Sequence, residues 1–418
     1  MTNLDFGGCS GKIGGRRFGM LAACLLGWAA MGGTAAPAAP AREQRPHAAR
    51  PISGHIALTF DDLPGLTILD DQAYVTYLNQ ALLRGLRLHH FPAIGFVNES
   101  KLDDLDRPKQ IAILRDWLDA GMDLGNHTFS HDAPEELGAT GYTEDIAKGE
   151  VVTKALLAEH HKTMRYFRHP YLKTGSTEAD KRYIDDWLAH HGYRIAPVTM
   201  NADDWEFAEP YDFAISHRDL AMQAHIKAEY LAHTEAMILW YRRASQAVFH
   251  RDIPYVILLH ATRLNADSLD DLAAILKRNR LKPVTLDRAM ADPAYRTRDP
   301  YVGKDGIDWM ERWAMELHRT LPNEDKNDPP KDIEEAYDRV DDDRCSGQTV
   351  NCGSPAPAAP AAVPAAPPAP AAANPAGSLR VRTPVSMQFE YQRHMVRGSR
   401  VAVMGLRRIR RGLNLIAL

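Results

Sequence analysis

The stretch HIALTFDDLPG, residues 55–65, joins an apolar run to two adjacent aspartates, Asp61 and Asp62. The apolar run is typical of a buried strand, and the Pro and Gly that follow the aspartates are typical of a turn. Two like charges at the end of a buried strand have two explanations. They either cap a helix or turn, or they belong to a site at the carboxyl end of a strand in an α/β fold.

Strand-like and helical segments alternate from residue 55 to residue 286. Apolar runs of strand length span residues 55–60, 91–98, 122–128, 164–170, 193–200, 254–260 and 282–286. Segments with helical apolar spacing lie between them, at residues 70–90, 107–120, 143–161, 178–191, 213–249 and 267–279. This alternation predicts an α/β fold with a parallel sheet, and about seven strands favour a distorted (β/α) barrel over an open sheet.

The composition of the 418-residue chain is that of a globular protein, 45% hydrophobic and 25% charged. Its formal net charge of -4 argues against a nucleic-acid-binding protein. Basic residues, a short apolar run at 18–31 and then small residues predict a signal peptide over residues 1–36, with a linker at 37–50. The run is short for a membrane span of roughly 20 residues. We therefore expect export, to the periplasm or the extracellular space.

Two cysteines remain after removal of the signal peptide, Cys345 and Cys352, both in a polar segment. Two cysteines alone make a poor zinc site, and an oxidising compartment favours their pairing. We expect them to close a small disulfide loop.

The catalytic domain is predicted to span residues 51–300, and the pattern changes after it. A partly helical extension is expected at 301–352, and the Pro/Ala-rich residues 353–378 are interpreted as a stiff linker. The tail at 379–418 is rich in Arg and contains a single acid, Glu390. Its mixture of Arg and aliphatic residues suits an anionic membrane or wall surface, and the alternative is a disordered, solvated tail.

Polar residues recur at the carboxyl ends of the predicted strands, where sites form in α/β barrels. After Asp61 and Asp62 come His127 and His131, Arg168 with Tyr171, Asp204 with Trp205, and finally Leu259 with His260. Each has an ordinary structural explanation, such as a surface ion pair, a helix cap or core packing. Those explanations do not account for the recurrence of polar groups at the same end of successive strands.

The pair His127 and His131 stands four residues apart in the segment GNHTFSH. That spacing presents two imidazoles to one metal, and a carboxylate would complete a facial triad with open positions for water and substrate. The spacing alone is a weak signal because the chain contains 18 His residues. Its weight comes from the other strand-end residues.

Five segments, taken in order over about residues 55–290, resemble the motifs of the polysaccharide deacetylase family, whose shared region is the NodB homology domain of carbohydrate esterase family 4. TFDDLP is similar to the family's TFDDGP, HTFSH to its H(S/T)xxH, and RHPY to its arginine-proline-tyrosine motif. DDW and LLH are similar to its acidic-tryptophan and leucine-histidine motifs. The ordered set is specific, whereas no single member is. The resemblance implies a NodB-like barrel and a metal-dependent hydrolase.

The resemblance also implies a role for each residue at the metal. Asp62, His127 and His131 would hold a divalent metal, zinc in the first place and cobalt as an alternative. Asp61 would be the general base for a water activated by that metal. Arg168 would pair with Asp61 and keep it ionised.

The resemblance implies that residues of the later motifs act on the leaving group and the acetyl group. His260 would be the general acid for the leaving amine, and Asp204 would orient His260 and raise its pKa. Tyr171 would offer its backbone N–H to the oxyanion. Trp205 and Leu259 would form the walls of a small pocket for the acetyl methyl group.

The chain departs from the family pattern at several positions that we expect to shape the groove. Leu63 and Leu172 replace Gly, His169 replaces Pro, and Asn201 replaces Asp. Leu63 is expected to place an apolar side chain beside the metal. Asn98 and Glu99 are expected to bring polar groups near the site. The helical segment 213–249 would either cover the cleft or pad the outside of the barrel.

These expectations describe an exported hydrolase that acts on carbon-nitrogen bonds other than peptide bonds. Its substrate would be an N-acetylated glycan such as peptidoglycan or a chitin-like polymer. Two alternatives keep the fold and change the reaction, an O-acetyl esterase and an amidase acting on a small molecule. A third is a catalytically silent glycan-binding protein, against which the intact set of polar residues argues.

Overall fold

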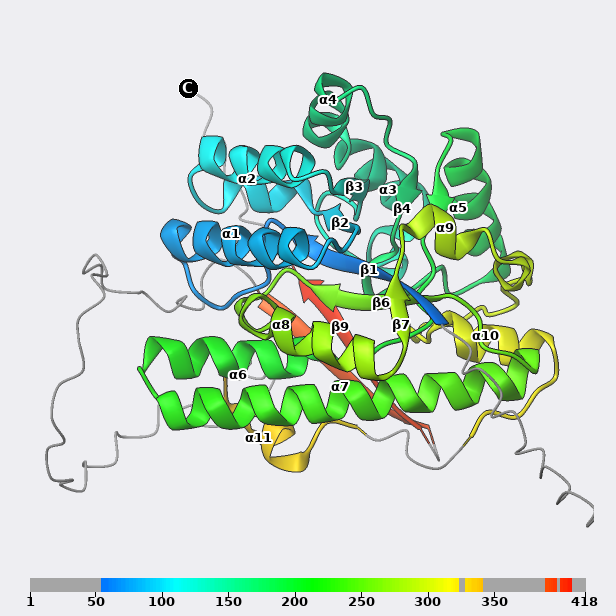
Figure 1. Ribbon diagram of the computed structural model, residues 1–418. Helices are drawn as coiled ribbons and strands as arrows, with labels where there is room; N and C mark the ends of the chain where they lie inside the picture. Colours follow the sequence, from blue (N-terminus) through cyan, green and yellow to red (C-terminus); the bar gives the residue numbers. More distant parts are fainter. Residues whose placement is uncertain (1–53, 323–327, 341–387, 397–398, 408–418) are drawn as a thin grey trace, which may run out of the picture. The chain divides into compact units, whose positions relative to one another are not determined.

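The computed structural model describes residues 54–322, 328–340, 388–396 and 399–407 of the chain (Figure 1). Several predictions concern segments outside these residues: the signal peptide at 1–36, the linker at 37–50, the pairing of Cys345 with Cys352, and the linker at 353–378. They remain predictions.

The sheet contains seven parallel strands, as the alternation predicts. They are β1 (Gly54–Leu63), β2 (Ala93–Val97), β3 (Asp123–Asn126), β4 (Tyr166–Phe167), β5 (Arg194–Ile195), β6 (Tyr255–His260) and β7 (Leu281–Pro283). The order across the sheet is β5-β4-β3-β2-β1-β6, and β7 pairs with the start of β1. A parallel bridge between Met200 and Ile257 joins the chain beyond β5 to β6. The sheet therefore curls on itself, which confirms the distorted barrel.

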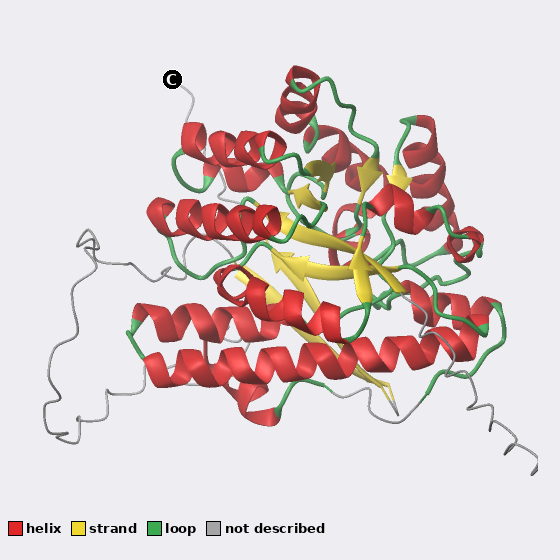
Figure 2. Cartoon of the chain, in the orientation of Figure 1, coloured by secondary structure: helices red, strands yellow, loops and turns green. Residues whose placement is uncertain are grey.

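Helices cover the outside of the strands (Figure 2). They are α1 (Gln72–Leu88), α2 (Arg107–Asp119), α3 (Pro134–Lys148), α4 (Val151–Glu159), α5 (Glu178–His190), α6 (Asp204–Ser216), α7 (Leu220–Phe249), α8 (Arg263–Arg278), α9 (Leu286–Met290), α10 (Trp309–Glu316) and α11 (Lys331–Val340). Short 3-10 turns follow some strands and helices: η1 (Glu99–Asp103), η2 (Pro170–Leu172) and η3 (Pro293–Arg296). Among the described residues, no helix combines the length and apolarity that a membrane crossing requires.

The predicted helix at 143–161 is in fact two helices, because the end of α3 and the start of α4 are separated at Gly149 and Glu150. The backbone of Gly149 lies against the loop after β3, and a Cβ there would approach the carbonyl carbon of Thr128 to 2.4 Å. A continuous helix with a side chain at this position would collide with that loop. The apolar periodicity of the segment carries no sign of this tertiary contact.

The helical region predicted at 213–249 begins earlier than expected, and it is divided into α6 and α7. Asp219 starts α7 by accepting a hydrogen bond from the backbone N–H of Met222 at 2.9 Å. Helix α7 packs along α6, α8 and α10, on the side of α8 that faces away from the strands (Figure 1). This arrangement supports the interpretation that the segment pads the outside of the barrel.

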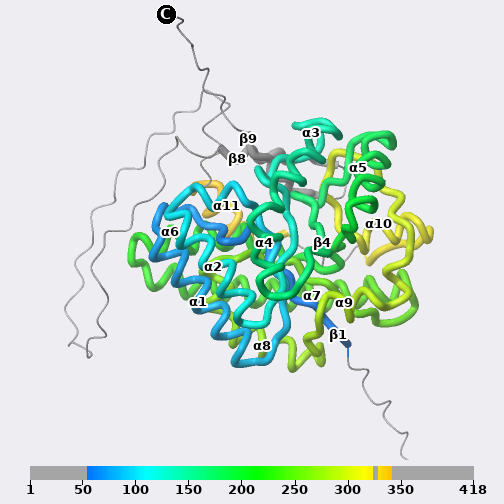
Figure 3. The backbone as a smooth tube through the Cα atoms, turned by 90° about the horizontal axis from the view of Figure 1, so that it is seen from above, coloured from blue at the N-terminus to red at the C-terminus, as the bar shows by residue number. Residues whose placement is uncertain are grey.

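The hydrophobic core places β1 at the centre of the site. Every residue of β1 except His55 is buried, and β1 is flanked by β2 on one side and β6 on the other. On one face Phe60 packs edge-to-face on Trp117 of α2, with ring centroids 5.7 Å apart. Helix α1 packs against both α2 and α8, which lie on the same side in the view from above (Figure 3). The carboxyl end of β1 is therefore held rigidly among its neighbours.

Within the tail, the structure describes one antiparallel pair of strands, β8 (Gln388–Val396) and β9 (Ser399–Arg407). The rest of the tail lies outside the described residues.

Candidate active site and metal centre

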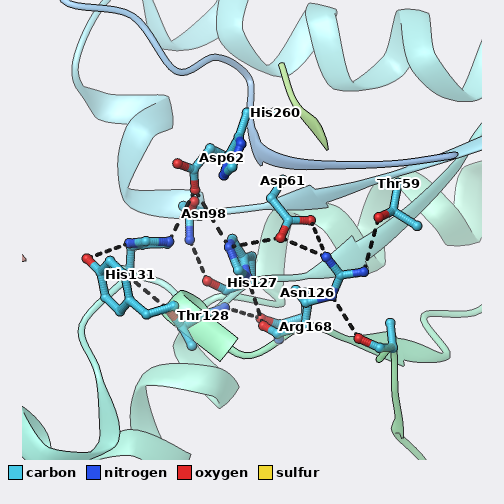
Figure 4. A network of polar contacts seen from close by, with 12 residues as sticks. Thr59, Asp61, Asp62, Asn98, Asn126, His127, Thr128, His131, Arg168 and His260 are labelled. Carbon is cyan, nitrogen blue, oxygen red and sulfur yellow. Dashed lines mark hydrogen bonds and ion pairs between the residues drawn. The ribbon is translucent and has the colours of Figure 1, made fainter. Parts of the chain in front are cut away.

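The residues predicted from five separate motifs converge at the carboxyl ends of the strands. Figure 4 shows Asp61, Asp62, His127, His131, Arg168 and His260 among them. Asp61 and Asp62 come from the end of β1, His127 and His131 follow β3, Arg168 follows β4, Asp204 begins α6, and His260 ends β6. In the ladder between β1 and β6, Asp61 lies directly opposite His260. Parallel strands bring their carboxyl ends to one edge, which explains why residues up to 200 positions apart meet there.

Asp62, His127 and His131 form a group whose ligand atoms all lie within 4.8 Å of one another. His131 Nε2 is 3.3 Å from Asp62 Oδ1, and His127 Nε2 is 3.7 Å from the same oxygen. Asp62 Oδ1 is buried and has no hydrogen-bond partner among the described residues. A buried carboxylate oxygen without a partner is costly, and a metal ion would satisfy it. The three side chains therefore fit a divalent metal.

The Nδ1 atoms of both imidazoles face away from Asp62 and are engaged elsewhere. His127 Nδ1 lies 2.8 Å from the backbone carbonyl of Arg168, to which it donates. His131 Nδ1 lies 2.8 Å from the hydroxyl of Tyr171. A partner on Nδ1 fixes the ring orientation and leaves the Nε2 lone pair available for a metal.

Burial lowers the pKa of His127 and of His131 to about 4. Both rings are therefore neutral at neutral pH, as metal ligands must be. Burial by itself would raise the pKa of Asp62, but the charge of Lys101, and those of the two histidines where they are protonated, outweigh it and hold that pKa below its usual range. The ammonium of Lys101 lies 3.4 Å from Asp62 Oδ2. Asp62 is thus held as an anion.

The loops that carry the three candidate metal ligands adopt backbone conformations that residues other than glycine rarely adopt. Asp62, Thr128 and His131 have φ angles of 66°, 65° and 67°, in the left-handed region. Such conformations cost on the order of 1–3 kcal/mol each and persist only where the surroundings impose them. Here the backbone N–H of His131 donates to Thr128 Oγ1 at 3.0 Å, and that of Thr128 donates to Asn126 Oδ1 at 2.8 Å.

Asp61 is held by Arg168 beside the metal group, with Asp61 Oδ2 3.7 Å from His127 Nε2. Arg168 Nη1 lies 3.0 and 2.9 Å from the two carboxylate oxygens of Asp61, and both side chains are almost fully buried. The remaining guanidinium donors bond the carbonyl of Ala196 at 2.7 Å and Thr59 Oγ1 at 3.1 Å. Burial lowers the pKa of Arg168, and the charge of Asp61 opposes that shift. A guanidinium remains protonated in such a site, so the pair stays ionic.

On the other side of Asp62, His260 is paired with Asp204. His260 Nδ1 lies 2.8 Å from Asp204 Oδ1, and the backbone N–H of His260 donates to Asp204 Oδ2, also at 2.8 Å. The amide of Asn265 donates to Asp204 Oδ2 at 2.6 Å and to the His260 carbonyl at 2.8 Å. Burial alone would lower the pKa of His260, but the charge and hydrogen bond of Asp204 raise it to about 9.

Three further residues were predicted to contact substrate. Tyr171 lies beside His131, with ring centroids 4.5 Å apart. Trp205 is nearly buried and packs edge-to-face on Tyr337 of α11 at 5.1 Å. Leu259 is fully buried in the core, so the structure does not bring it to an open surface. The roles of these residues toward substrate remain predictions.

The expectation for Leu63 is corrected by the structure. Its side chain is fully buried in the core and packs against Gly95 of β2, where a Cβ would lie 2.5 Å from Leu63 Cδ2. Leu63 therefore packs in the core against β2 and does not line an open groove. In a regular strand, Leu63 would face the same way as Asp61, because side chains alternate between the two faces. The register of β1 with β2 shifts between Phe60 and Leu63, so the alternation does not hold there.

Other departures also act within the fold. His169 is fully buried, with Nδ1 3.1 Å from the hydroxyl of Tyr142. Leu172 has a φ angle of 57°, and its side chain is buried. Asn201 bonds Asp203, its near neighbour, at 2.7 Å. None of these contacts involves the metal group.

Of the two polar residues after β2, Asn98 lies near the metal group and Glu99 does not. The Asn98 amide donates to the backbone carbonyl of His127, so Asn98 lies beside the metal group as expected (Figure 4). Glu99 instead turns to the start of α4, where it accepts from the backbone N–H groups of Val152 and Thr153 at 3.0 and 2.7 Å. Free N–H groups at a helix start favour a carboxylate. Glu99 is therefore a helix cap.

Five contributors to the site were not singled out from the sequence: Thr59, Lys101, Asn126, Thr128 and Asn265. Thr59, Asn126 and Thr128 lie within or beside the TFDDLP and HTFSH segments, so the motifs did point to their neighbourhood. Lys101 and Asn265 lie outside every motif. Their contacts join different loops and leave no local pattern.

Residues 49–194 match the model of the family described as polysaccharide deacetylase. No curated protein matches the chain. Among solved structures, the polysaccharide deacetylase Bc1974 from Bacillus cereus is 17% identical, with 56% of this chain and 91% of that chain covered and a TM-score of 0.39. A family 4 carbohydrate esterase from Streptomyces lividans, in complex with acetate, is 20% identical, with coverage of 56% and 95% and a TM-score of 0.37. BA3943 from Bacillus anthracis, a pseudoenzyme of that family, is 15% identical, with coverage of 57% and 66% and a TM-score of 0.40.

The matched segment contains Asp61, Asp62, His127, His131 and Arg168, the residues of the metal group and of the buried ion pair beside it. The resemblance to the polysaccharide deacetylase family that the motifs indicate is thus confirmed over residues 49–194.

Proposed function

We propose that the protein is an exported, metal-dependent hydrolase that removes N-acetyl groups from a glycan such as peptidoglycan or a chitin-like polymer. The observation that carries this proposal is the position of Asp61 and His260. They face each other across the β1–β6 ladder, and the unpartnered oxygen of Asp62 belongs to the next residue of β1. A proton acceptor and a proton donor thus flank one candidate metal group.

Asp62, His127 and His131 would hold the metal, which we propose to be zinc, with cobalt as an alternative. When bound, such an ion polarises the amide carbonyl and acidifies water, so that attack proceeds at neutral pH. The neutral imidazoles and the ionised Asp62 supply the ligand set that this ion prefers.

Asp61 would accept the proton of the attacking water. Its two oxygens are held by Arg168 Nη1, so the carboxylate is oriented before substrate arrives. Arg168 is a positioning residue in this scheme, since it acts through Asp61.

His260 would give its proton to the leaving nitrogen as the carbon-nitrogen bond breaks. Its pKa of about 9 keeps the imidazole protonated at neutral pH. Asp204 holds the ring through Nδ1, which leaves Nε2–H as the donor. The products are acetate and a free amine on the glycan. Asp61 takes one proton from the water and His260 gives one to the leaving nitrogen, so the protons balance.

The remaining assignments are supported by the family motifs. The backbone N–H of Tyr171 would stabilise the oxyanion, and Trp205 and Leu259 would border the acetyl methyl group. Export rests on the apolar run at 18–31, and attraction of the basic tail to an anionic membrane or wall surface rests on its Arg content.

Acetate release from a panel of N- and O-acetylated glycans tests the proposal. The purified chain is assayed as prepared, after chelation, and after chelation followed by zinc or cobalt. We expect release from N-acetylated glycans, loss on chelation and recovery with metal. Release from O-acetylated glycans alone would identify an esterase instead. Binding of glycan without any release under these conditions would identify a silent binding protein.

A further inference from the structure

Residues 299–313, which follow the last strand of the sheet, lie against the loop that carries Tyr171. The backbone N–H of Gly303 approaches the carbonyl of Gly175 at 3.4 Å. Gly306 lies directly on Tyr171, and a Cβ at 306 would come within 1.7 Å of the Tyr171 carbonyl oxygen. No side chain fits between these backbones, so only glycine permits the contact.

Arg312, on α10, completes this contact from inside the protein. Its side chain is fully buried, and its Nη2 donates to the carbonyl of Leu172 at 2.5 Å. Its Nη1 donates to Thr174 Oγ1 at 3.1 Å and to Asp299 Oδ2 at 2.7 Å. The guanidinium also stacks 4.2 Å from the ring centroid of Trp309. A planar group with several fixed donors holds its acceptors in a single geometry.

The loop that receives these contacts is strained. Tyr171 and Leu172 have successive φ angles of 53° and 57°, both in the left-handed region. Two adjacent side-chain-bearing residues adopt this conformation only where the surrounding structure imposes it. Gly306 contacts the carbonyl of Tyr171, and Arg312 contacts that of Leu172. The segment 299–313 thus acts on the two strained residues.

The loop in turn positions a metal ligand. The hydroxyl of Tyr171 lies 2.8 Å from His131 Nδ1, and the two rings are packed edge-to-face. The partner of the second imidazole nitrogen sets the direction of the nitrogen that binds metal. A shift of Tyr171 would therefore turn His131 relative to Asp62.

We infer that residues 299–313 are a positioning element of the metal site, in which Arg312 and Gly306 hold Tyr171 in the conformation that orients His131. The inference deepens the proposed function and rests on it, because it takes His131 as a metal ligand. Arg312 is a positioning residue, since it acts on the metal only through Leu172, Tyr171 and His131. An Arg that merely stabilises the core would affect unfolding and leave metal affinity unchanged.

The test compares three variants of the full-length chain: Arg312→Lys, Gly306→Ala and Tyr171→Phe. Zinc affinity is measured by competition with a chromophoric chelator, unfolding by circular dichroism, and kcat and KM by acetate release. We expect each folded variant to bind zinc about 10-fold more weakly or worse, as loss of an outer contact to a metal-binding His does. At saturating zinc, kcat should remain reduced while KM changes little, because the element orients groups that react and does not bind the glycan.

Arg298→Gln is the matched control. Arg298 lies just before the segment and forms an exposed ion pair with Glu316 of α10 at 2.6 Å. Both hydrogen bonds of its side chain go to Glu316 and neither goes to the Tyr171 loop, so zinc affinity, kcat and KM should equal those of the unmodified chain.

Several results would overturn the inference. Folded Arg312→Lys and Gly306→Ala variants with zinc affinity within twofold of the unmodified chain would remove the link from the segment to the loop. An unchanged Tyr171→Phe would remove the link from the loop to His131. Failure of both Arg312→Lys and Gly306→Ala to fold would assign the segment a general stabilising role instead. If the unmodified chain binds no zinc, both the metal centre and this inference are refuted. If it binds zinc but releases no acetate, only the proposed function is refuted.

Discussion

Arg168 Nη1 contacts both carboxylate oxygens of Asp61, at 3.0 and 2.9 Å, in a pair that is almost completely shielded from water. The other guanidinium nitrogens are bound to Ala196 and Thr59, so Arg168 cannot rotate without losing further hydrogen bonds. The ion pair joins β1 to the loop after β4. It therefore links the stability of the barrel to the orientation of the proposed base.

Replacing Arg168 by Met should destabilise the protein strongly. The substitution leaves Asp61 buried without its partner, and loss of one member of a buried pair costs about 3–5 kcal/mol of unfolding free energy. Urea unfolding measures the change. Arg115→Met is the control, because Arg115 forms an exposed pair with Glu159 that is worth about 1 kcal/mol or less. Equal losses in the two variants would contradict a special role for the buried pair.

Asp61→Asn and His131→Ala should separate catalysis from metal binding. Asp61→Asn keeps the shape of the side chain and removes the proton acceptor, so metal content should persist while kcat falls by about 10²–10⁴-fold. His131→Ala removes a ligand, so both metal content and activity should be lost. Metal analysis and acetate release measure the two effects. The control is His160→Ala, a histidine that pairs with Asp119 on the surface. Near-normal turnover by Asp61→Asn would refute its assignment as base.

The activity should decline at alkaline pH because His260 must carry a proton. Its pKa in the folded protein is about 9, so the acid form predominates below that pH and is lost above it. Asp204→Asn removes the charge that raises this pKa, and the alkaline limb of the kcat profile should move to lower pH. The control Asp270→Asn alters an exposed carboxylate and should leave the limb in place. An unshifted limb in Asp204→Asn would show that another group titrates.

The same pair should contribute to stability in a defined pH window. The folded pKa of His260 lies above its usual value of about 6.5 in an unfolded chain. The native state therefore binds this proton more tightly, and the contribution is fully present below pH 6.5 and is lost as pH rises through about 9. The difference in unfolding free energy between the unmodified chain and His260→Gln should shrink over that range. A constant difference from pH 6 to pH 10 would contradict the expectation.

Leu63→Ala tests the corrected placement of Leu63. Because its side chain is fully buried against Gly95, its truncation should leave a cavity and cost about 2–5 kcal/mol of unfolding free energy. The KM for glycan should be unchanged, since the side chain faces the core. Leu88→Ala, at a position that is 69% exposed, serves as the control for loss of an aliphatic side chain. A changed KM with unchanged stability would return Leu63 to the groove.

Local patterns predicted much of the fold because strand and helix periodicity depends on near neighbours. The seven strands lie where the apolar runs predicted them. The break at Gly149 was missed because it results from contact with Thr128, which belongs to another loop. Leu63 was misplaced for a related reason. Its direction depends on a register shift in the pairing of β1 with β2, between Phe60 and Leu63.

The order of polar residues along the chain was enough to nominate Asp61, Asp62, His127, His131, Arg168, Asp204 and His260 as residues that the fold would bring together. Only the tertiary structure decided how those side chains are held. Asn265 supports the pair of Asp204 and His260, and Lys101 lies against Asp62. Arg312 reaches the carbonyl of Leu172 across 140 positions of sequence. Each of these contacts is a hydrogen bond or ion pair between segments that meet only in the folded chain, so no local spacing encodes it.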